Sequence, residues 1–107
     1  MDENLKKIKE IILQVAKEMN IEIDKIILFG SRARGDYRED SDYDLLIVTK
    51  EKLDRKIYKS FYSKIVKELA KHKIFGDFII VSKKYFEERK DKVEDISYYA
   101  LREGILI

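Results

Sequence analysis

The segment from Ile26 to Thr49 reads IILFGSRARGDYREDSDYDLLIVT, and the rest of the chain is organised around it. Its two ends are apolar runs that predict strands, and a Gly-Ser turn followed by a charged loop joins them. Because side chains alternate between the two faces of a strand, Asp42 and Asp44 are expected to project from the same face. Two like charges about 5 Å apart repel by about 3 kcal/mol at an effective dielectric of about 20. We therefore expect a counter-charge at this position, and carboxylate oxygens suit a divalent ion such as Mg²⁺.

The Gly30-Ser31 turn is a candidate phosphate site at the same edge of the predicted sheet. Glycine lets a phosphate approach the backbone closely, and a short helix starting after the turn would direct N–H groups at the anion. Arg32 and Arg34 add guanidinium groups that can bind a phosphate through paired hydrogen bonds. A Gly-Ser turn is also common in ordinary loops, and loop arginines are often simply solvated. Phosphate on one side and a metal ion on the other would together form a nucleotide site.

Asp77 stands directly before the third predicted strand and could bring a third carboxylate to that edge. A Gly-Asp pair such as Gly76-Asp77 is also a common turn, so Asp77 taken alone would be a structural residue. Beside Asp42 and Asp44 we interpret it as part of the same site.

Composition bounds the class of protein. The chain has 107 residues, which fits one domain over residues 1–107 with a core of its own, and its hydrophobic fraction of 45% excludes a disordered chain. No apolar run approaches the roughly 20 residues of a membrane span, and the charged N-terminus lacks the apolar core of a signal peptide. The absence of cysteine excludes disulfides and thiolate metal sites and fits a cytoplasmic location. The 23 basic and 21 acidic residues leave a net charge of +2, which argues against direct nucleic-acid binding as the main function.

Helices and strands alternate along the chain. Apolar residues at three- and four-residue steps predict helices over residues 3–19, 51–71 and 92–103. Apolar runs predict strands at Lys25–Phe29, Tyr43–Val48 and Phe78–Val81. Ser82 is a candidate cap for a further helical segment that ends at Glu88. Asn20 and Gly104 are candidate stops for the first and the last helix. Residues 105–107 are expected to pack as a tail. This order of elements indicates an α/β fold in which helices flank a small sheet.

Other polar and aromatic residues have simpler interpretations. Ser41 is interpreted as a turn residue, although it could also hold the loop. The only histidine, His72, lies at a lysine-rich helix end, where capping or solvation is expected. The lysines between residues 52 and 73 are expected to form a solvated helix face, with RNA or an acidic partner as the alternative. Four tyrosines are expected to cover the core or an interface: Tyr58, Tyr62, Tyr98 and Tyr99.

The motif as a whole resembles a known family. Gly-Ser, ten further residues, then Asp-x-Asp and an apolar run is similar to the pattern of the nucleotidyltransferase superfamily that includes DNA polymerase beta and kanamycin nucleotidyltransferase. The fuller string GSRARGDYREDSDYDLLIV resembles the minimal nucleotidyltransferases of archaea and bacteria, and the closing ALREGILI resembles their ends. The resemblance covers about residues 25–107 and implies a polymerase-beta-like fold with a small mixed sheet flanked by helices. Many minimal nucleotidyltransferases are encoded beside a HEPN-domain ribonuclease toxin and act as its antitoxin.

The resemblance also implies a role for each motif residue. It assigns Gly30 and Ser31 to the triphosphate of ATP. It assigns two Mg²⁺ ions to Asp42, Asp44 and Asp77, with the last of these beside the acceptor hydroxyl. In such a site one ion lowers the pKa of the attacking hydroxyl and the other neutralises the triphosphate and the leaving pyrophosphate. An aspartate beside the hydroxyl could also accept its proton.

Three functions compete at this point. The first is Mg²⁺-dependent transfer of AMP from ATP to a hydroxyl, a tyrosine in the resembling family, of a partner HEPN toxin. The second is an antitoxin or binding module that neutralises its partner by contact alone, with a vestigial nucleotide site. The third, an RNA-binding regulator, is disfavoured by the nearly balanced charge.

Overall fold

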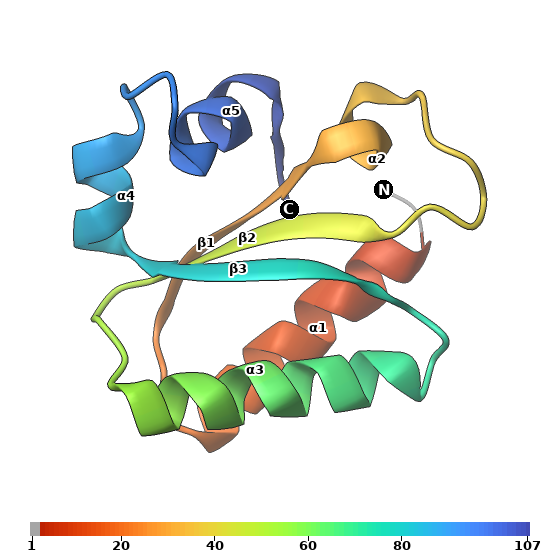
Figure 1. Ribbon diagram of the computed structural model, residues 1–107. Helices are drawn as coiled ribbons and strands as arrows, with labels where there is room; N and C mark the ends of the chain where they lie inside the picture. The colour runs from red at the N-terminus through yellow and green to blue at the C-terminus, as the bar shows by residue number, and fades with distance from the viewer. Residues whose placement is uncertain (1–2) are drawn as a thin grey trace.

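The computed structural model describes residues 3–107 of the chain (Figure 1). Two of the residues expected in the domain, 1 and 2, lie outside this range. In chain order the elements are α1 (Glu3–Glu18), β1 (Ile23–Phe29), α2 (Gly30–Arg34), β2 (Tyr43–Thr49), α3 (Arg55–Ala70), β3 (Gly76–Ser82), α4 (Lys83–Arg89), α5 (Ile96–Glu103) and β4 (Ile105–Leu106). None of the described helices is both long and apolar enough to cross a bilayer.

The four strands form one mixed sheet in the order β3-β2-β1-β4. β1 runs antiparallel to both β2 and β4, whereas β2 and β3 are parallel and joined through α3. A parallel pair needs a crossover connection, and a helix is the usual one. The predicted α/β class with a small mixed sheet is therefore confirmed, and β3 and β4 are the two edge strands.

The larger core lies between the sheet and the helices α1 and α3, which cover one face together (Figure 1). Because strand side chains alternate, every second residue of the inner strands points to this face. The sheet contributes Ile26, Leu28, Leu45, Ile47, Phe78 and Ile80. The predicted helical stripes supply the other side with Ile8, Ile12, Phe61, Ile65 and Leu69, all fully buried.

The opposite face carries a smaller core under α4 and α5. Its buried members are Ile27, Leu46, Val48, Phe86 and Ala100. The apolar middle of β1 and of β2 is thus buried on both faces, which is why these strands read as continuous apolar runs. On the same face, the residues that come before this smaller core are Asp44 in β2 and Asp77 in β3. These two aspartates belong to the candidate site.

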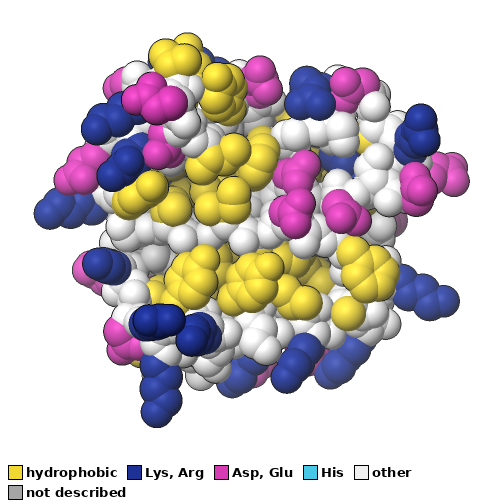
Figure 2. Space-filling view, viewed as in Figure 1, with side chains coloured by type: hydrophobic (Ala, Val, Ile, Leu, Met, Phe, Trp, Pro, Cys, Tyr) yellow, Lys and Arg dark blue, Asp and Glu magenta, His cyan; other side chains and the backbone are white. Residues whose placement is uncertain are grey.

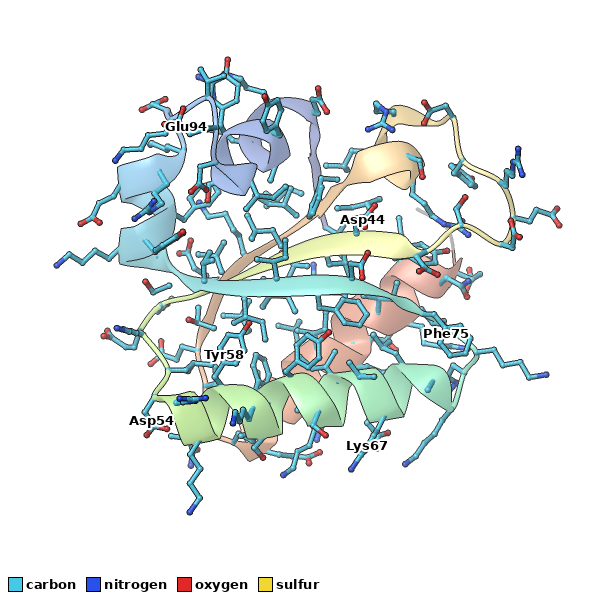
Figure 3. All side chains as sticks on the ribbon, viewed as in Figure 1. Asp44, Asp54, Tyr58, Lys67, Phe75 and Glu94 are labelled. Carbon is cyan, nitrogen blue, oxygen red and sulfur yellow. The ribbon has the colours of Figure 1, made fainter. Side chains whose placement is uncertain are left out.

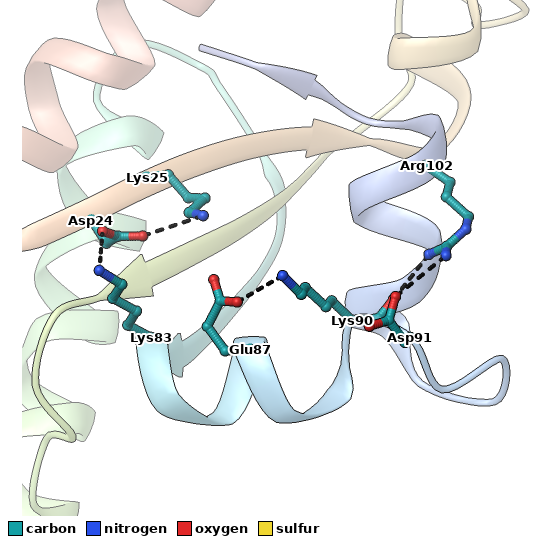
Figure 4. A network of polar contacts seen from close by, with 7 residues as sticks. All are labelled: Asp24, Lys25, Lys83, Glu87, Lys90, Asp91 and Arg102. Atoms are coloured by element: carbon teal, nitrogen blue, oxygen red, sulfur yellow. Dashed lines mark hydrogen bonds and ion pairs between the residues drawn. The ribbon is translucent and has the colours of Figure 1, made fainter.

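Ion pairs join β1 to α4, and another pair joins the turn after α4 to α5 (Figure 4). The Asp24 carboxylate pairs with Lys25 Nζ at 3.4 Å and with Lys83 Nζ at 3.9 Å. The Lys25 ammonium also lies 4.8 Å from the centre of the Phe86 ring. Surface ion pairs of this kind contribute little each, about 0–1 kcal/mol, so this network positions α4 rather than dominating its stability.

Side-chain caps decide several boundaries that the apolar periodicity could not locate. Ser82 caps α4 by accepting a hydrogen bond from the Tyr85 amide at 3.1 Å, as predicted, and Asn20 has the expected positive φ of 57°. The predicted start of the last helix at Lys92 is wrong. Its first residue is Ile96, because Asp95 accepts from the Ser97 amide at 2.9 Å and ends the preceding turn.

Two further differences have separate causes, a side-chain cap and a backbone pairing. The long helix begins at Arg55 rather than at residue 51, because the Asp54 side chain accepts from the Ile57 amide at 2.9 Å. The expected tail forms the short strand β4 on β1, and the Ile107 amide continues this pairing by donating to the Ile26 carbonyl at 3.0 Å.

Candidate active site

Asp44 and Asp77 are partners in the parallel ladder between β2 and β3. Both side chains belong to the face of the smaller core, because Leu46 and Ile79, two residues further along each strand, pack there. Asp44 is half-buried and Asp77 is exposed. Figure 3 shows Asp44 on β2 beneath α2, and Figure 2 shows acidic side chains gathered at this end of the strands.

Asp42 lies in the loop just before β2 and is exposed. Its position two residues before Asp44 was the reason to expect both on one face. The structure brings its charge within electrostatic reach of Asp44, because Asp42 contributes to raising the pKa of that carboxyl. Asp44 and Asp77 therefore lie side by side at one end of the β2–β3 pair, and the charge of Asp42 acts on Asp44 from the loop before it.

The pKa of Asp44 is raised above its ordinary value of 3.8. The largest cause is burial, followed by the negative charges of Asp77 and Asp42, and the nearby Arg34 acts in the opposite direction. Burial and like charges both disfavour an ionised carboxyl. The site thus carries excess negative charge, which a bound cation would neutralise.

The chemistry of this donor set fits a divalent cation such as Mg²⁺, which prefers carboxylate and water oxygens. Within residues 3–107, no three acidic, histidine or cysteine side chains are already arranged to hold a metal ion. Carboxylates without a counter-ion are expected to stay apart because they repel one another. Asp44 and Asp77 share an edge and a face, and closing them together with Asp42 around an ion requires side-chain movement.

Gly30 lies directly against Asp44. Its φ is +72°, and a Cβ built on this glycine would overlap the Asp44 carboxylate. L-residues with a side chain rarely adopt this backbone conformation, so both φ and space require glycine here. The turn predicted as a phosphate site and the carboxylate predicted as a metal ligand are therefore in contact.

Ser31 and Arg34 lie on α2, the short helix that follows this turn. The Ser31 side chain is partly exposed, and the Arg34 guanidinium is close enough to lower the pKa of Asp44. Arg34 also pairs with Asp36 at 3.4 Å in an exposed contact. Both groups lie at the edge where the carboxylates meet.

Arg32 has a different position from the one its sequence context indicated. Its Nε donates to the Ser41 carbonyl at 3.0 Å, and Nη2 donates to the Glu39 and Ser41 carbonyls at 2.8 Å each. Its guanidinium carbon also lies 4.1 Å from the Tyr43 ring centre and 4.5 Å from that of Tyr37. Arg32 therefore organises the loop that leads to Asp42. No feature of the sequence pattern pointed to this function.

Ser41 combines both of its predicted roles. Its hydroxyl accepts from the Arg38 amide at 2.9 Å, and its own amide donates to the Arg38 carbonyl at 3.0 Å. This closed turn holds the carbonyl that Arg32 binds. Hydrogen bonds of the loop residues before Asp42, rather than packing, therefore determine where the backbone of Asp42 lies.

The remaining candidates lie away from this edge. His72 is exposed in the turn after α3, as expected for a solvated residue. Tyr58 and Tyr62 are exposed on α3, where Tyr62 makes an edge-to-face contact with Phe78 at 6.4 Å between ring centres.

Comparisons with known proteins agree with this geometry. The sequence profile of the family described as "Nucleotidyltransferase domain" matches residues 5–103. A crystal structure of a candidate nucleotidyltransferase from Sulfolobus solfataricus superposes with a TM-score of 0.51 and 26% identity, over 96% of this chain and 80% of that one.

Two curated proteins of Methanocaldococcus jannaschii, each named as a candidate protein adenylyltransferase, match shorter segments. One is 50% identical over 44 residues, which are 41% of this chain and 44% of that protein. The other is 56% identical over 43 residues, which are 40% of this chain and 43% of that protein. The chain therefore matches less than half the length of either curated relative.

Proposed function

Because this chain belongs to the nucleotidyltransferase domain family, we propose that it transfers AMP from ATP to a hydroxyl of a partner protein. The observation that carries the proposal is the pairing of Asp44 with Asp77 across β2 and β3, with Asp42 on the same side. The names of the two Methanocaldococcus relatives support a protein as the acceptor. The resemblance to minimal nucleotidyltransferases supports a HEPN ribonuclease toxin as that protein, with tyrosine as the modified residue and cytoplasm as the location.

The residues of the site divide the work of this reaction. Asp42, Asp44 and Asp77 would hold Mg²⁺, which when bound would neutralise the triphosphate and lower the pKa of the attacking hydroxyl. The hydroxyl of Ser31 and the guanidinium of Arg34 donate hydrogen bonds to phosphate oxygens. Arg32 keeps the loop closed, so that Asp42 stays beside the other two carboxylates.

The balance of the reaction is that of nucleotidyl transfer. The acceptor oxygen forms a bond to the α-phosphorus of ATP, and the bond from that phosphorus to the bridging oxygen breaks. Pyrophosphate leaves with the electron pair. Asp77 is exposed where an acceptor can reach it, and its carboxylate takes the hydroxyl proton.

The decisive experiment follows the α- and γ-phosphates of ATP separately. The protein is incubated with Mg²⁺, a HEPN ribonuclease toxin as the proposed partner, and ATP labelled at one phosphate or the other. We expect α-label on the partner and γ-label in pyrophosphate, and a partner mass increased by one or more AMP units. Transfer of the γ-label would instead indicate phosphorylation and contradict the proposal.

A matched variant separates catalysis from neutralisation by contact. Asp42→Asn with Asp44→Asn preserves the shape of both side chains and removes the charges that hold the ion. We expect this variant to bind the partner but not to label it, and toxicity to return in cells. A variant that still neutralises the toxin fully, with a partner whose mass never changes, would leave contact alone as the mechanism.

A further inference from the structure

The strand that begins at Asp77 has one open edge. Among the described residues 3–107, β3 pairs with β2 and with no other strand. Exposed edges are usually blunted by shortness, proline, lysine or inward-pointing charge. The opposite edge strand, β4, follows this rule, since it is two residues long. β3 is seven residues long, reads GDFIIVS, and carries no proline and no charge except Asp77.

Two contacts show which backbone groups of β3 face outwards. The Phe75 carbonyl accepts from the Tyr43 amide at 3.1 Å, and the Val81 carbonyl accepts from the Thr49 hydroxyl at 3.4 Å. Odd-numbered residues therefore direct their backbone groups at β2. By alternation along the strand, the N–H and C=O groups of Phe78 and Ile80 point to the open edge.

Apolar side chains line this edge on both sides (Figure 2). Between β3 and α3 lie Tyr58, Tyr62 and Phe75, which are 36%, 37% and 58% exposed. Figure 3 shows that Tyr58 and Phe75 mark the two ends of this row, with Phe75 near the acidic end. Exposed apolar side chains that flank unpaired backbone groups are typical of a binding surface rather than of scattered surface residues.

A hollow of about 680 Å³ opens where β3 ends. Tyr58 from α3, Val81 from β3 and Tyr85 from α4 contribute to its walls. Ser82 lies five positions after Asp77, which corresponds to about 16 Å along a strand. The edge thus connects the candidate site at one end with a partly apolar hollow at the other.

We propose that the free edge of β3 binds an extended segment of the acceptor protein as an added strand, which places the acceptor hydroxyl beside Asp77. The inference rests on the proposed function, since it names how the protein substrate of that site is held. A polypeptide is the occupant because only a peptide backbone offers donors and acceptors at the spacing of Phe78 and Ile80.

The same geometry specifies the bound segment. Side chains of an added strand alternate, so one set lies over the row from Tyr58 to Phe75. An apolar or aromatic residue about five positions from the acceptor fills the hollow beside Tyr85, because that distance matches the strand rise. Backbone pairing supplies affinity, and this anchor residue supplies selectivity.

The test uses a displayed library of linear peptides of about eight residues, each with one tyrosine, selected on the protein without ATP or Mg²⁺. Hydrogen exchange of the backbone amides is then measured by NMR with and without a selected peptide. We expect exchange at the Phe78 and Ile80 amides to slow about tenfold or more, since both gain a strand partner. The amides of Ile79 and Val81 already face β2 and should change little.

Variants of the side chains that line the edge test the same proposal through the affinity for the peptide. Tyr58→Glu with Tyr85→Glu should weaken peptide binding about tenfold or more, because the two aromatic walls of the hollow are lost. Leu13→Glu is the matched control, since Leu13 is similarly exposed at 41% but lies on α1. Equal weakening by the control, selected peptides that leave Phe78 and Ile80 unprotected, or a library that yields no binder would each overturn the proposal. Concentration-dependent protection without peptide would also overturn it, since the occupant would then be a second copy.

The readout distinguishes this proposal from the proposed function. Peptide binding and amide protection are measured again with Asp44→Asn, which should retain both. Protection at β3 without AMP transfer to any acceptor would support the edge and contradict the enzyme. AMP transfer to a partner that leaves Phe78 and Ile80 unprotected would support the enzyme and contradict the edge.

Discussion

Gly30 and Asp44 are in direct contact, and the backbone conformation of Gly30 leaves no space for a side-chain carbon beside the carboxylate. Replacing Gly30 by alanine therefore adds two costs, positive-φ strain and overlap with Asp44. We expect Gly30→Ala to destabilise the protein by about 3 kcal/mol and to displace Asp44 from the site. Urea denaturation measures the first effect and Mg²⁺-dependent nucleotide binding the second.

Gly35→Ala is the matched control for this prediction. Gly35 also has a positive φ of 85°, but an added Cβ would meet nothing within 4 Å. The control should cost about 1 kcal/mol from φ alone and leave ligand binding unchanged. Equal costs for the two variants would show that the contact with Asp44 is unimportant.

Asp44→Asn is expected to stabilise the protein without metal at neutral pH, because it removes a carboxylate whose ionised form is disfavoured in the folded state. The pKa of Asp44 is raised in the folded state, so folding is opposed while this carboxyl is ionised. That cost disappears as the pH falls through the folded pKa toward the ordinary value of 3.8. The gain in melting temperature should therefore be present above the folded pKa and vanish at low pH.

The same variant should lose the stabilisation that Mg²⁺ and nucleotide confer on the parent, because ligands that bind only the folded state raise its melting temperature. Asp40→Asn, an exposed loop carboxylate, is the control and should keep that rise. Equal ligand-induced shifts in Asp44→Asn and the parent would place the metal elsewhere.

Arg32→Ala should open the loop that leads to Asp42. The side chain donates to two loop carbonyls and stacks on Tyr43, so we expect a loss of about 1–2 kcal/mol and faster proteolysis between residues 35 and 42. Arg32→Lys should rescue little of this, since an ammonium lacks the planar fork. Arg34→Ala provides the contrast: stability within about 0.5 kcal/mol of the parent and weaker nucleotide binding.

Asp95 should show the opposite pH dependence to Asp44. Burial raises the pKa of Asp95, but hydrogen bonds from Ser97 and the charge of Arg89 outweigh it and leave the pKa lowered. The stability it contributes is therefore full above the unfolded pKa and is lost as the pH falls through the folded one. Asp95→Ala should cost about 1 kcal/mol at neutral pH and nothing in acid, measured by urea unfolding across pH. A cost that persists in acid would assign the effect to packing.

The sequence predicted the α/β class and the strands Lys25–Phe29 and Tyr43–Val48, because long apolar runs have few alternatives; the structure extends them to Ile23–Phe29 and Tyr43–Thr49. It also led us to expect Asp42 and Asp44 on one face, but Asp42 lies in the loop before β2, where the alternation of a strand does not decide its direction. The place of Asp77 opposite Asp44 depends on the register of β2 against β3, which the chain between them does not encode locally.

The features that escaped prediction all depend on tertiary contacts. An arginine beside a Gly-Ser turn is a typical phosphate ligand, and only the folded loop shows that the donors of Arg32 are already bound to carbonyl groups. The contact of Gly30 with Asp44 joins residues that stand on different elements. The pairing of β4 with β1 follows from space left at the sheet edge, which no two-residue pattern can indicate.

The unequal edges of the sheet also determine how copies of this chain can associate. Two β3 strands can pair antiparallel around a two-fold axis, and that contact uses up both open edges. A head-to-tail contact of β3 on β4 would allow fibres to grow, but β4 offers only two residues for pairing. Symmetric contacts close, whereas head-to-tail contacts propagate unless the rotation forms a ring. The open edge of β3 is long, but pairing of copies through the sheet edges would stop at a dimer, because β4 is too short to extend the sheet further.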